Sequence, residues 1–307
     1  PFSVSFENDT KDYTLSGGGR IAGTGWLAKN LGGTVTILTA NTYSGPTTVN
    51  DGELRFGNGT ANGGITGPLA NEARVVFYPA GSAAYAGSIS GSDAGTFVKT
   101  GSGTQVLTGS ISSSGTFEVN EGTLQIGDGA VNGSFGAVVY QIAAGATLRR
   151  ESATAAAPTW ANINGKGTLA LNTAQAVNGS ADWGALALPA GFAGTLRVER
   201  GRVGANAGAE ALGGTSLIQI LPGAQLLNFT SAVPFTQPIE IAGGGWGEVG
   251  YPGGLRLAAG ATATWAGPVT LTANSGIMAQ RTATFTVTGA ITGAFRCEFY
   301  AGDPVGD

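Results

Sequence analysis

The sequence predicts an all-β protein, a β-solenoid with roughly 20–25 residues per coil. Three observations carry this prediction. Glycine accounts for 54 of the 307 residues, which indicates many tight turns. Hydrophobic residues reach 42%, enough to form a core, and they alternate with polar residues in short runs. Finally, the same strand-and-turn phrases recur along the chain, as a stack of similar coils requires.

The clearest repeat has two copies. Residues 27–59 read LAKNLGGTVTILTANTYSGPTTVNDGELRFGNG, and residues 97–129 read FVKTGSGTQVLTGSISSSGTFEVNEGTLQIGDG. A weaker copy of the central part, GTLRVERGRVG, occupies residues 194–204. A second phrase recurs as YQIAAGATL (140–148), IQILPGAQL (218–226) and LRLAAGATA (255–263). Because no helical periodicity interrupts these phrases, we expect residues 1–307 to form a single solenoid domain of roughly 13 coils.

Within each copy, alternation predicts which side chains face the core. The predicted structural core of the repeat consists of Val49, Leu54, Phe56, Val119, Leu124 and Ile126. The predicted turn glycines are Gly52, Gly57, Gly122 and Gly127, which can adopt positive φ without steric cost. We expect equivalent residues of the repeat to stack on their counterparts in neighbouring coils.

An antiparallel sandwich could use similar short strands, with hairpins at the Asn-Gly dipeptides. The repeats argue against it, because only a solenoid needs the same short sequence in coil after coil.

The two copies resemble the autotransporter-associated β-strand repeat, also called the passenger-associated transport repeat. The resemblance rests on Lys99–Thr104 (KTGSGT), Leu107–Gly109 (LTG), Asn41–Gly45 (NTYSG), Thr47–Val49 (TTV) and Gly122–Leu124 (GTL). It implies a right-handed parallel β-helix that is secreted or displayed at the surface of a Gram-negative-type cell. Such repeats occur in long adhesin-like proteins, and the repeat itself has no catalytic residues. The chain ends in GAFRCEFYAGDPVGD without strands for a membrane barrel, so the export route is left open.

Composition narrows the possible functions. The chain has no histidine, and Cys297 is its single cysteine. The commonest general base, internal disulfides and thiolate zinc sites are therefore excluded. We interpret Cys297 as a small buried hydrophobic residue. A net charge of −4 without a basic stripe argues against nucleic acid, and no apolar run is long enough for a transmembrane helix.

Several motifs offer chemistry, but each has a simpler explanation. Gly245–Gly250 fits G-x-G-x-x-G, yet a Tyr-Pro-Gly-Gly turn follows where a dinucleotide site needs a helix. The aspartates do not recur at calcium-binding spacing. The acidic residues at repeat-related positions are too scattered for a polysaccharide lyase or hydrolase; they are Asp51, Glu53, Glu118 and Glu121. Trp246 and Tyr251, in a glycine-rich loop, form the best candidate glycan contact, although core packing also explains them.

The sequence therefore predicts a non-enzymatic, extracellular or cell-surface structural protein with no cofactor or metal. Its partner is expected to be a second copy of itself, associating head to tail or by strand donation into a fibre or coat, because uncapped coil ends offer free backbone groups. The alternatives are an adhesin or autotransporter passenger segment that binds glycan or a host surface and, less favoured, a polysaccharide-degrading enzyme.

Overall fold

The structure is a computed structural model that describes residues 3–154, 160–173, 182–227, 231–247 and 252–302. It confirms the expected fold: an all-β parallel β-solenoid of about 13 turns, with coils roughly 22 residues apart and almost no helix. The residues group into two compact units, Pro1–Arg149 and Arg150–Asp307, and each is described by itself below.

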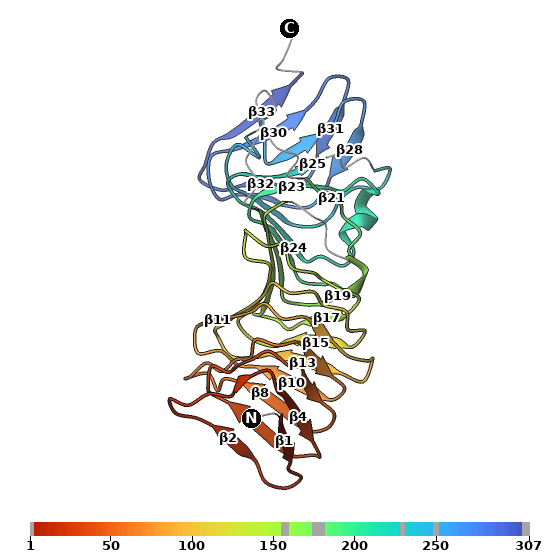
Figure 1. Cartoon of the computed structure of the whole chain (residues 1–307). Coiled ribbons are helices and arrows are strands. Elements are labelled where there is room, and N and C mark those ends of the chain that lie inside the picture. Colours follow the sequence, from red (N-terminus) through yellow and green to blue (C-terminus); the bar gives the residue numbers. More distant parts are fainter. Residues whose placement is uncertain (1–2, 155–159, 174–181, 228–230, 248–251, 303–307) are drawn as a thin grey trace. The chain divides into compact units, whose positions relative to one another are not determined.

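The coils of the first unit pass through three sides in a fixed order, and successive coils stack along Figure 1 from red to yellow. Sheet I consists of β1 (Ser3–Glu7), β4 (Trp26–Asn30), β7 (Thr47–Val49), β9 (Leu69–Asn71) and β12 (Ile89–Ser90). Sheet II consists of β2 (Tyr13–Leu15), β5 (Thr34–Ile37), β8 (Glu53–Phe56), β10 (Arg74–Phe77), β13 (Thr96–Lys99), β15 (Thr116–Val119) and β17 (Val139–Ile142). The third side holds β3 (Ala22–Gly23) paired with β6 (Thr42–Tyr43), followed by β11 (Ser82–Tyr85), β14 (Thr104–Leu107) and β16 (Thr123–Ile126).

Register in sheet II shows how the core is built. Val35 pairs with Leu54 of the next coil, and Phe117 pairs in the same way with Tyr140. All four side chains are 0–1% exposed. In each of these strands the inward residues alternate with outward ones, so inward side chains stack into columns between coils.

Two neighbouring columns carry aromatic rings: Phe56 pairs with Phe77 in one, and Phe97, Phe117 and Tyr140 pair in the other. The ring of Phe117 stacks on Phe97 and Tyr140 at centroid distances of 5.4 and 5.9 Å, and it lies 6.1 Å from the ring of Phe77. Phe77 in turn stacks on Phe56 at 5.7 Å. These buried rings come from five successive strands of sheet II, β8, β10, β13, β15 and β17.

The second unit repeats the same construction, with β18 (Thr147–Ser152) at the border between the units. One of its sides consists of β20 (Thr168–Thr173), β22 (Thr195–Val198), β24 (Leu217–Ile220), β26 (Ile239–Ile241), β29 (Val269–Leu271) and β32 (Ile291–Thr292). Another consists of β21 (Asp182–Ala185), β23 (Gly201–Gly204), β25 (Ala224–Leu227), β27 (Leu255–Leu257), β30 (Ser275–Ala279) and β33 (Cys297–Ala301). The remaining elements are β19 (Ile163–Gly165), the pair β28 (Thr262–Trp265) and β31 (Thr284–Val287), and the short 3₁₀ helices η1 (Trp160–Asn162) and η2 (Gly208–Leu212).

Candidate functional site

The two repeat copies share a specific arrangement at one of their corners, built around a buried lysine. Lys29 lies near the end of β4, and its side chain turns inward beneath the corner instead of reaching solvent. Its ammonium donates to the carbonyl oxygens of Asn30 (2.8 Å), Leu31 (2.5 Å) and, in the next coil, Asp51 (3.1 Å). The residue is fully buried, at 0% exposure. A buried ammonium is tolerated only when its donors are satisfied, and here three N–H groups meet three acceptors.

The second copy reproduces this geometry. The Lys99 ammonium donates to the carbonyl oxygens of Thr100 (2.9 Å), Gly101 (2.7 Å) and Glu121 (3.0 Å), and Lys99 is also 0% exposed. Burial lowers the pKa of Lys99 to about 8, and the nearby Glu121 carboxylate partly opposes this shift. Burial also lowers the pKa of Lys29, against the pull of Asp51 and the acidic residues of the first coil. We call these two arrangements the lysine corners.

Each lysine corner is completed by a glycine in the coil above. Gly52 has φ +68°, and a Cβ on it would lie 2.4 Å from the carbonyl oxygen of Leu31 and 2.7 Å from Lys29 Nζ. Gly122 has φ +62°, and a Cβ there would lie 2.4 Å from the carbonyl oxygen of Gly101. Both positions therefore need glycine for its backbone conformation and for the close approach of the corner below. The other two predicted turn glycines, Gly57 and Gly127, have φ +84° and +85°.

The structure places the predicted core residues inside. Val49, Leu54, Val119, Leu124 and Ile126 are 0% exposed, and Phe56 is 4% exposed. Their neighbours differ from our expectation, because the two copies do not stack on each other. Val49 pairs with Lys29 and Asn71, whereas Val119 pairs with Lys99 and Ile142.

The reason lies in the offset between the copies. From β4 the chain returns to sheet I three times, at β7, β9 and β12, and β13 then follows on sheet II. The path from Lys29 to Lys99 is therefore three coils and one further side, so Lys29 lies in sheet I and Lys99 in sheet II. Equivalent residues occupy different sides of the solenoid, and the expectation that they stack directly is wrong.

The acidic residues at repeat-related positions take part in local contacts. Glu53 binds Arg55 at 2.5 Å and Arg74 at 3.1 Å, and Glu118 lies 3.8 Å from Arg74. Asp51 accepts the backbone N–H of Gly52 (2.7 Å), and Glu121 accepts that of Gly101 (2.8 Å). Within the described ranges, no three His, Cys, Asp or Glu residues come together in a way that could hold a metal ion.

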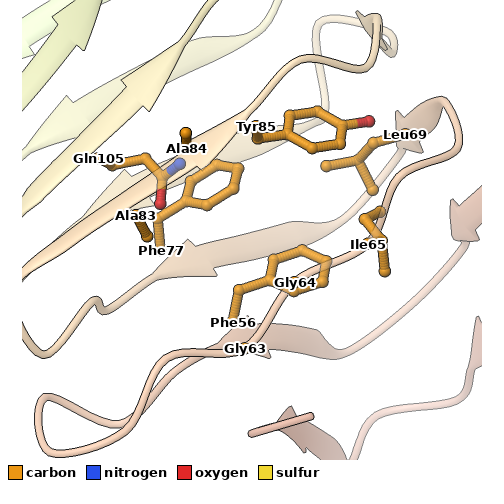
Figure 2. Close-up of a pocket in the computed structure, with 10 residues that line it drawn as sticks. All are labelled: Phe56, Gly63, Gly64, Ile65, Leu69, Phe77, Ala83, Ala84, Tyr85 and Gln105. Atoms are coloured by element: carbon orange, nitrogen blue, oxygen red, sulfur yellow. The ribbon is translucent and has the colours of Figure 1, made fainter. Parts of the chain in front are cut away.

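Two pockets in the first unit also lack paired carboxylates. One, of about 20 Å³, lies between Phe56, Phe77, Tyr85 and the Gly63–Gly64 loop, as Figure 2 shows. It has room for about one water molecule. The other, of about 300 Å³, is lined by residues of 14–21 together with Thr39 and Asn41, and Arg20 is its charged residue. Neither arrangement resembles the acid–base pair of a glycosidase.

The remaining sequence candidates are placed as follows. Trp246 is 2% exposed, so its indole offers no face to a sugar ring. Tyr251 lies outside the described residues, as does Gly250 of the G-x-G-x-x-G motif. Cys297 is half-buried at the start of β33, not in the core. Among the described tryptophans, Trp26 is the exposed one, at 40%.

The predictions from sequence do not include Lys29 and Lys99 among the functional residues, so the role of these lysines was missed. The available signal was that an ionisable residue recurs at the same place in two copies of an otherwise apolar and glycine-rich pattern. No helix in the described part of the chain is long and apolar enough to cross a membrane.

Comparison with known protein families matches the two segments that contain the lysine corners. The family model of the passenger-associated-transport-repeat matches residues 29–56 and 97–126. The chain carries two passenger-associated transport repeats. Each matched segment begins at or just before a lysine corner and ends in the strand that follows the glycine above it, β8 or β16. Each match therefore contains both parts of one lysine corner, the buried lysine and the glycine one coil later.

One curated relative gives further context. The chain is 33% identical over 158 residues to a protein described as "Adhesin BmaC autotransporter" from Brucella suis biovar 1 (strain 1330). The similar region covers 40% of this chain and 5% of that adhesin, so this chain corresponds to a small part of the adhesin's length. No solved structure matches the chain.

Proposed function

We propose that the chain is a non-enzymatic structural segment of a surface-exposed, passenger-type protein, and that it self-assembles into a fibre or coat. One observation carries this proposal: the residues that the repeat specifies are used to hold one coil on the next. The inward side chains form columns, and the buried ammoniums bind carbonyls of two successive coils.

The electrostatics support a structural role. Catalytic carboxylates usually lie in a cleft whose surroundings shift their pKa. Glu53 instead pairs with two arginines on an outer face. Asp51 and Glu121 accept hydrogen bonds from backbone N–H groups at corners. The buried lysines use all three of their protons in hydrogen bonds. An extracellular location is supported by the passenger-associated repeat and by the similarity to an autotransporter adhesin.

Electron microscopy of the purified chain over a range of concentrations tests the proposal. We expect fibres or sheets that become longer or more numerous as concentration rises. A reducing-end assay on neutral and acidic polysaccharides, run on the same material, should show no release of sugar. Monomeric particles at every concentration, or sugar release that scales with protein, would overturn the proposal.

Adhesion is a second candidate function, favoured by the 33% identity to an adhesin autotransporter. An exposed indole is the natural sugar-stacking group, and Trp26 supplies one in the first unit. A glycan array probed with the wild-type chain and with Trp26→Ala tests this function. Signal that falls with Trp26→Ala but not with Trp246→Phe supports adhesion through this face, whereas an array without signal argues against glycan binding.

A further inference from the structure

The corner that follows β8 carries a motif that the packing of the coils does not use. Residues 58–60 read Asn-Gly-Thr, an Asn-x-Ser/Thr sequon, which is the acceptor pattern of N-linked glycosylation. The chain contains five such sequons, which begin at Asn8, Asn58, Asn132, Asn178 and Asn228. The last two of these asparagines lie outside the described residues, so the structure compares the first three.

Exposure separates the three described sequons. Asn8 is 3% exposed, and its amide nitrogen donates to two backbone carbonyl oxygens, at 2.8 and 3.2 Å. Asn132 is half-buried. Asn58 and Thr60, in contrast, are both exposed. Within the described part of the chain, the Asn58 side chain forms its hydrogen bonds through Oδ1, and its Nδ2 group donates none.

The second repeat copy shows which atom of Asn58 the corner needs. Residues 57–63 read GNGTANG, and residues 127–133 read GDGAVNG, with Asp128 in the place of Asn58. Oδ1 of Asn58 accepts the backbone N–H groups two and three residues later, at 3.0 and 2.8 Å. Oδ1 of Asp128 accepts the corresponding groups at 2.9 and 2.7 Å. The turn therefore requires one side-chain oxygen, and the Nδ2 group of Asn58 has no counterpart in the second copy.

The hydroxyl of Thr60 is equally dispensable to the turn. It donates to Oδ1 of Asn58 at 2.9 Å, but the second copy has Ala130 at this position and retains the same backbone hydrogen bonds. The first copy thus differs from the second by an exposed carboxamide and an exposed hydroxyl two residues apart. These are the two groups that define a sequon.

We propose that Asn58 is a site of N-linked glycosylation on the folded chain. The sugar donor belongs to the class of nucleotide-activated sugars. One N–H bond of the Asn58 carboxamide breaks, a bond forms between Nδ2 and the anomeric carbon, the nucleoside diphosphate leaves, and a proton is released. The product would be a bulky polar group on the outer surface of the corner. This site does not depend on self-assembly, since a monomeric chain exposes the same asparagine.

Glycosylation of the folded chain in vitro tests whether the corner is an acceptor. The donor is UDP-glucose, and the enzyme is a sequon-specific N-glycosyltransferase already active on a synthetic Asn-Gly-Thr peptide. Trypsin cleaves after Arg55 and Arg74, so residues 56–74 form one peptide, while Asn8 lies in the peptide of residues 1–11. We expect mass spectrometry to find one hexose on the first peptide, at Asn58, and none on the second. An unmodified peptide 56–74, or equal modification of both peptides, would overturn the proposal.

The second copy also supplies the matched variants. Asn58→Asp and Thr60→Ala introduce the residue types that Asp128 and Ala130 already place in this turn, so both variants should unfold at the same temperature as wild type. Both should lose the hexose, and Thr60→Ser should retain it. A hexose that persists in Thr60→Ala would contradict recognition of the sequon.

The same peptide from chain isolated from its native cells tests use of the site in the cell. We expect its mass to exceed that of the bare peptide by one or more sugar residues, and Asn58→Asp should abolish the difference. A bare peptide in the native material would overturn the assignment of Asn58 as a glycosylation site, and it would leave the proposed structural role unchanged.

Discussion

The ammonium group of Lys99 donates a 3.0 Å hydrogen bond to the carbonyl oxygen of Glu121, 22 residues further along the chain and one coil away. Lys29 and Asp51 have the same relationship, at the same spacing and 3.1 Å. A fully buried charge thus binds the backbone of two coils at once. Each matched segment is slightly longer than one coil and contains both partners of this contact.

Replacing Lys99 with methionine should destabilise the first unit. The substitution keeps the apolar stem but leaves three corner carbonyls without their donor, which should lower the free energy of unfolding by about 2–4 kcal/mol. Urea unfolding followed by circular dichroism measures the change. Lys11→Met is the control, since Lys11 is exposed and its loss should change stability by less than about 0.5 kcal/mol. Equal effects of the two substitutions would contradict a special role for the corner.

Lys99→Met should also differ from wild type in the pH dependence of its stability. The pKa of Lys99 is about 8 in the folded chain, below its ordinary value of 10.5, so between these pH values the unfolded state binds more protons. The stability of wild type relative to Lys99→Met should therefore rise from pH 8 to pH 10.5 and be constant below pH 8. Urea titrations at several pH values measure this difference, and a flat or falling curve over that interval would refute the shift.

Gly122→Ala should be among the most damaging single substitutions in the repeat. A Cβ at this position would lie 2.4 Å from the carbonyl oxygen of Gly101 and 2.5 Å from that of Gly103, so the corner must open. We expect a loss of more than about 3 kcal/mol. Gly145 also has a positive φ, +85°, but nothing lies within 4 Å of its added Cβ. Gly145→Ala should cost only about 1–2 kcal/mol of backbone strain, and thermal unfolding of the two variants compares them.

Leu31→Gly should stabilise the chain. Leu31 adopts φ +60° at the place where the second copy has Gly101 with φ +72°, and its side chain is 45% exposed. Relief of left-handed strain should exceed the entropy cost of glycine and add about 0.5–1 kcal/mol. Leu31→Ala is the control, since alanine retains the Cβ that causes the strain. A thermal midpoint for Leu31→Gly at or below that of Leu31→Ala would rule out strain at this position.

Much of the fold could be predicted because alternation and glycine act locally. The pattern around Val119, Leu124 and Ile126 predicts which side chains point inward, and the structure buries all three. The number of residues per coil also follows from the spacing of the recurring phrases, since the chain must return to nearly the same side after each coil. What spacing alone could not supply was the side on which each copy lies. The offset between the copies is not a whole number of coils. Its extra side is found only when every corner between the copies has been counted.

The candidate site was harder to foresee. Lysine is usually a surface residue, and nothing local to Lys29 indicates that carbonyls from residues 30, 31 and 51 will converge on it. Burial of Trp246 was equally inaccessible, because a glycine-rich context suggests an exposed loop while the fold encloses the indole. Both features depend on contacts between distant parts of the chain.

The shift of one side between repeat copies has a consequence for how such proteins change length. Duplicating the segment that runs from one lysine corner to the next would not only lengthen the stack of the first unit but also rotate the coils beyond it by about a third of a turn. A loop that faced one direction would then face another, and three duplications would restore its original bearing. The number of inserted segments would therefore set the direction in which the surface loops beyond the insertion face.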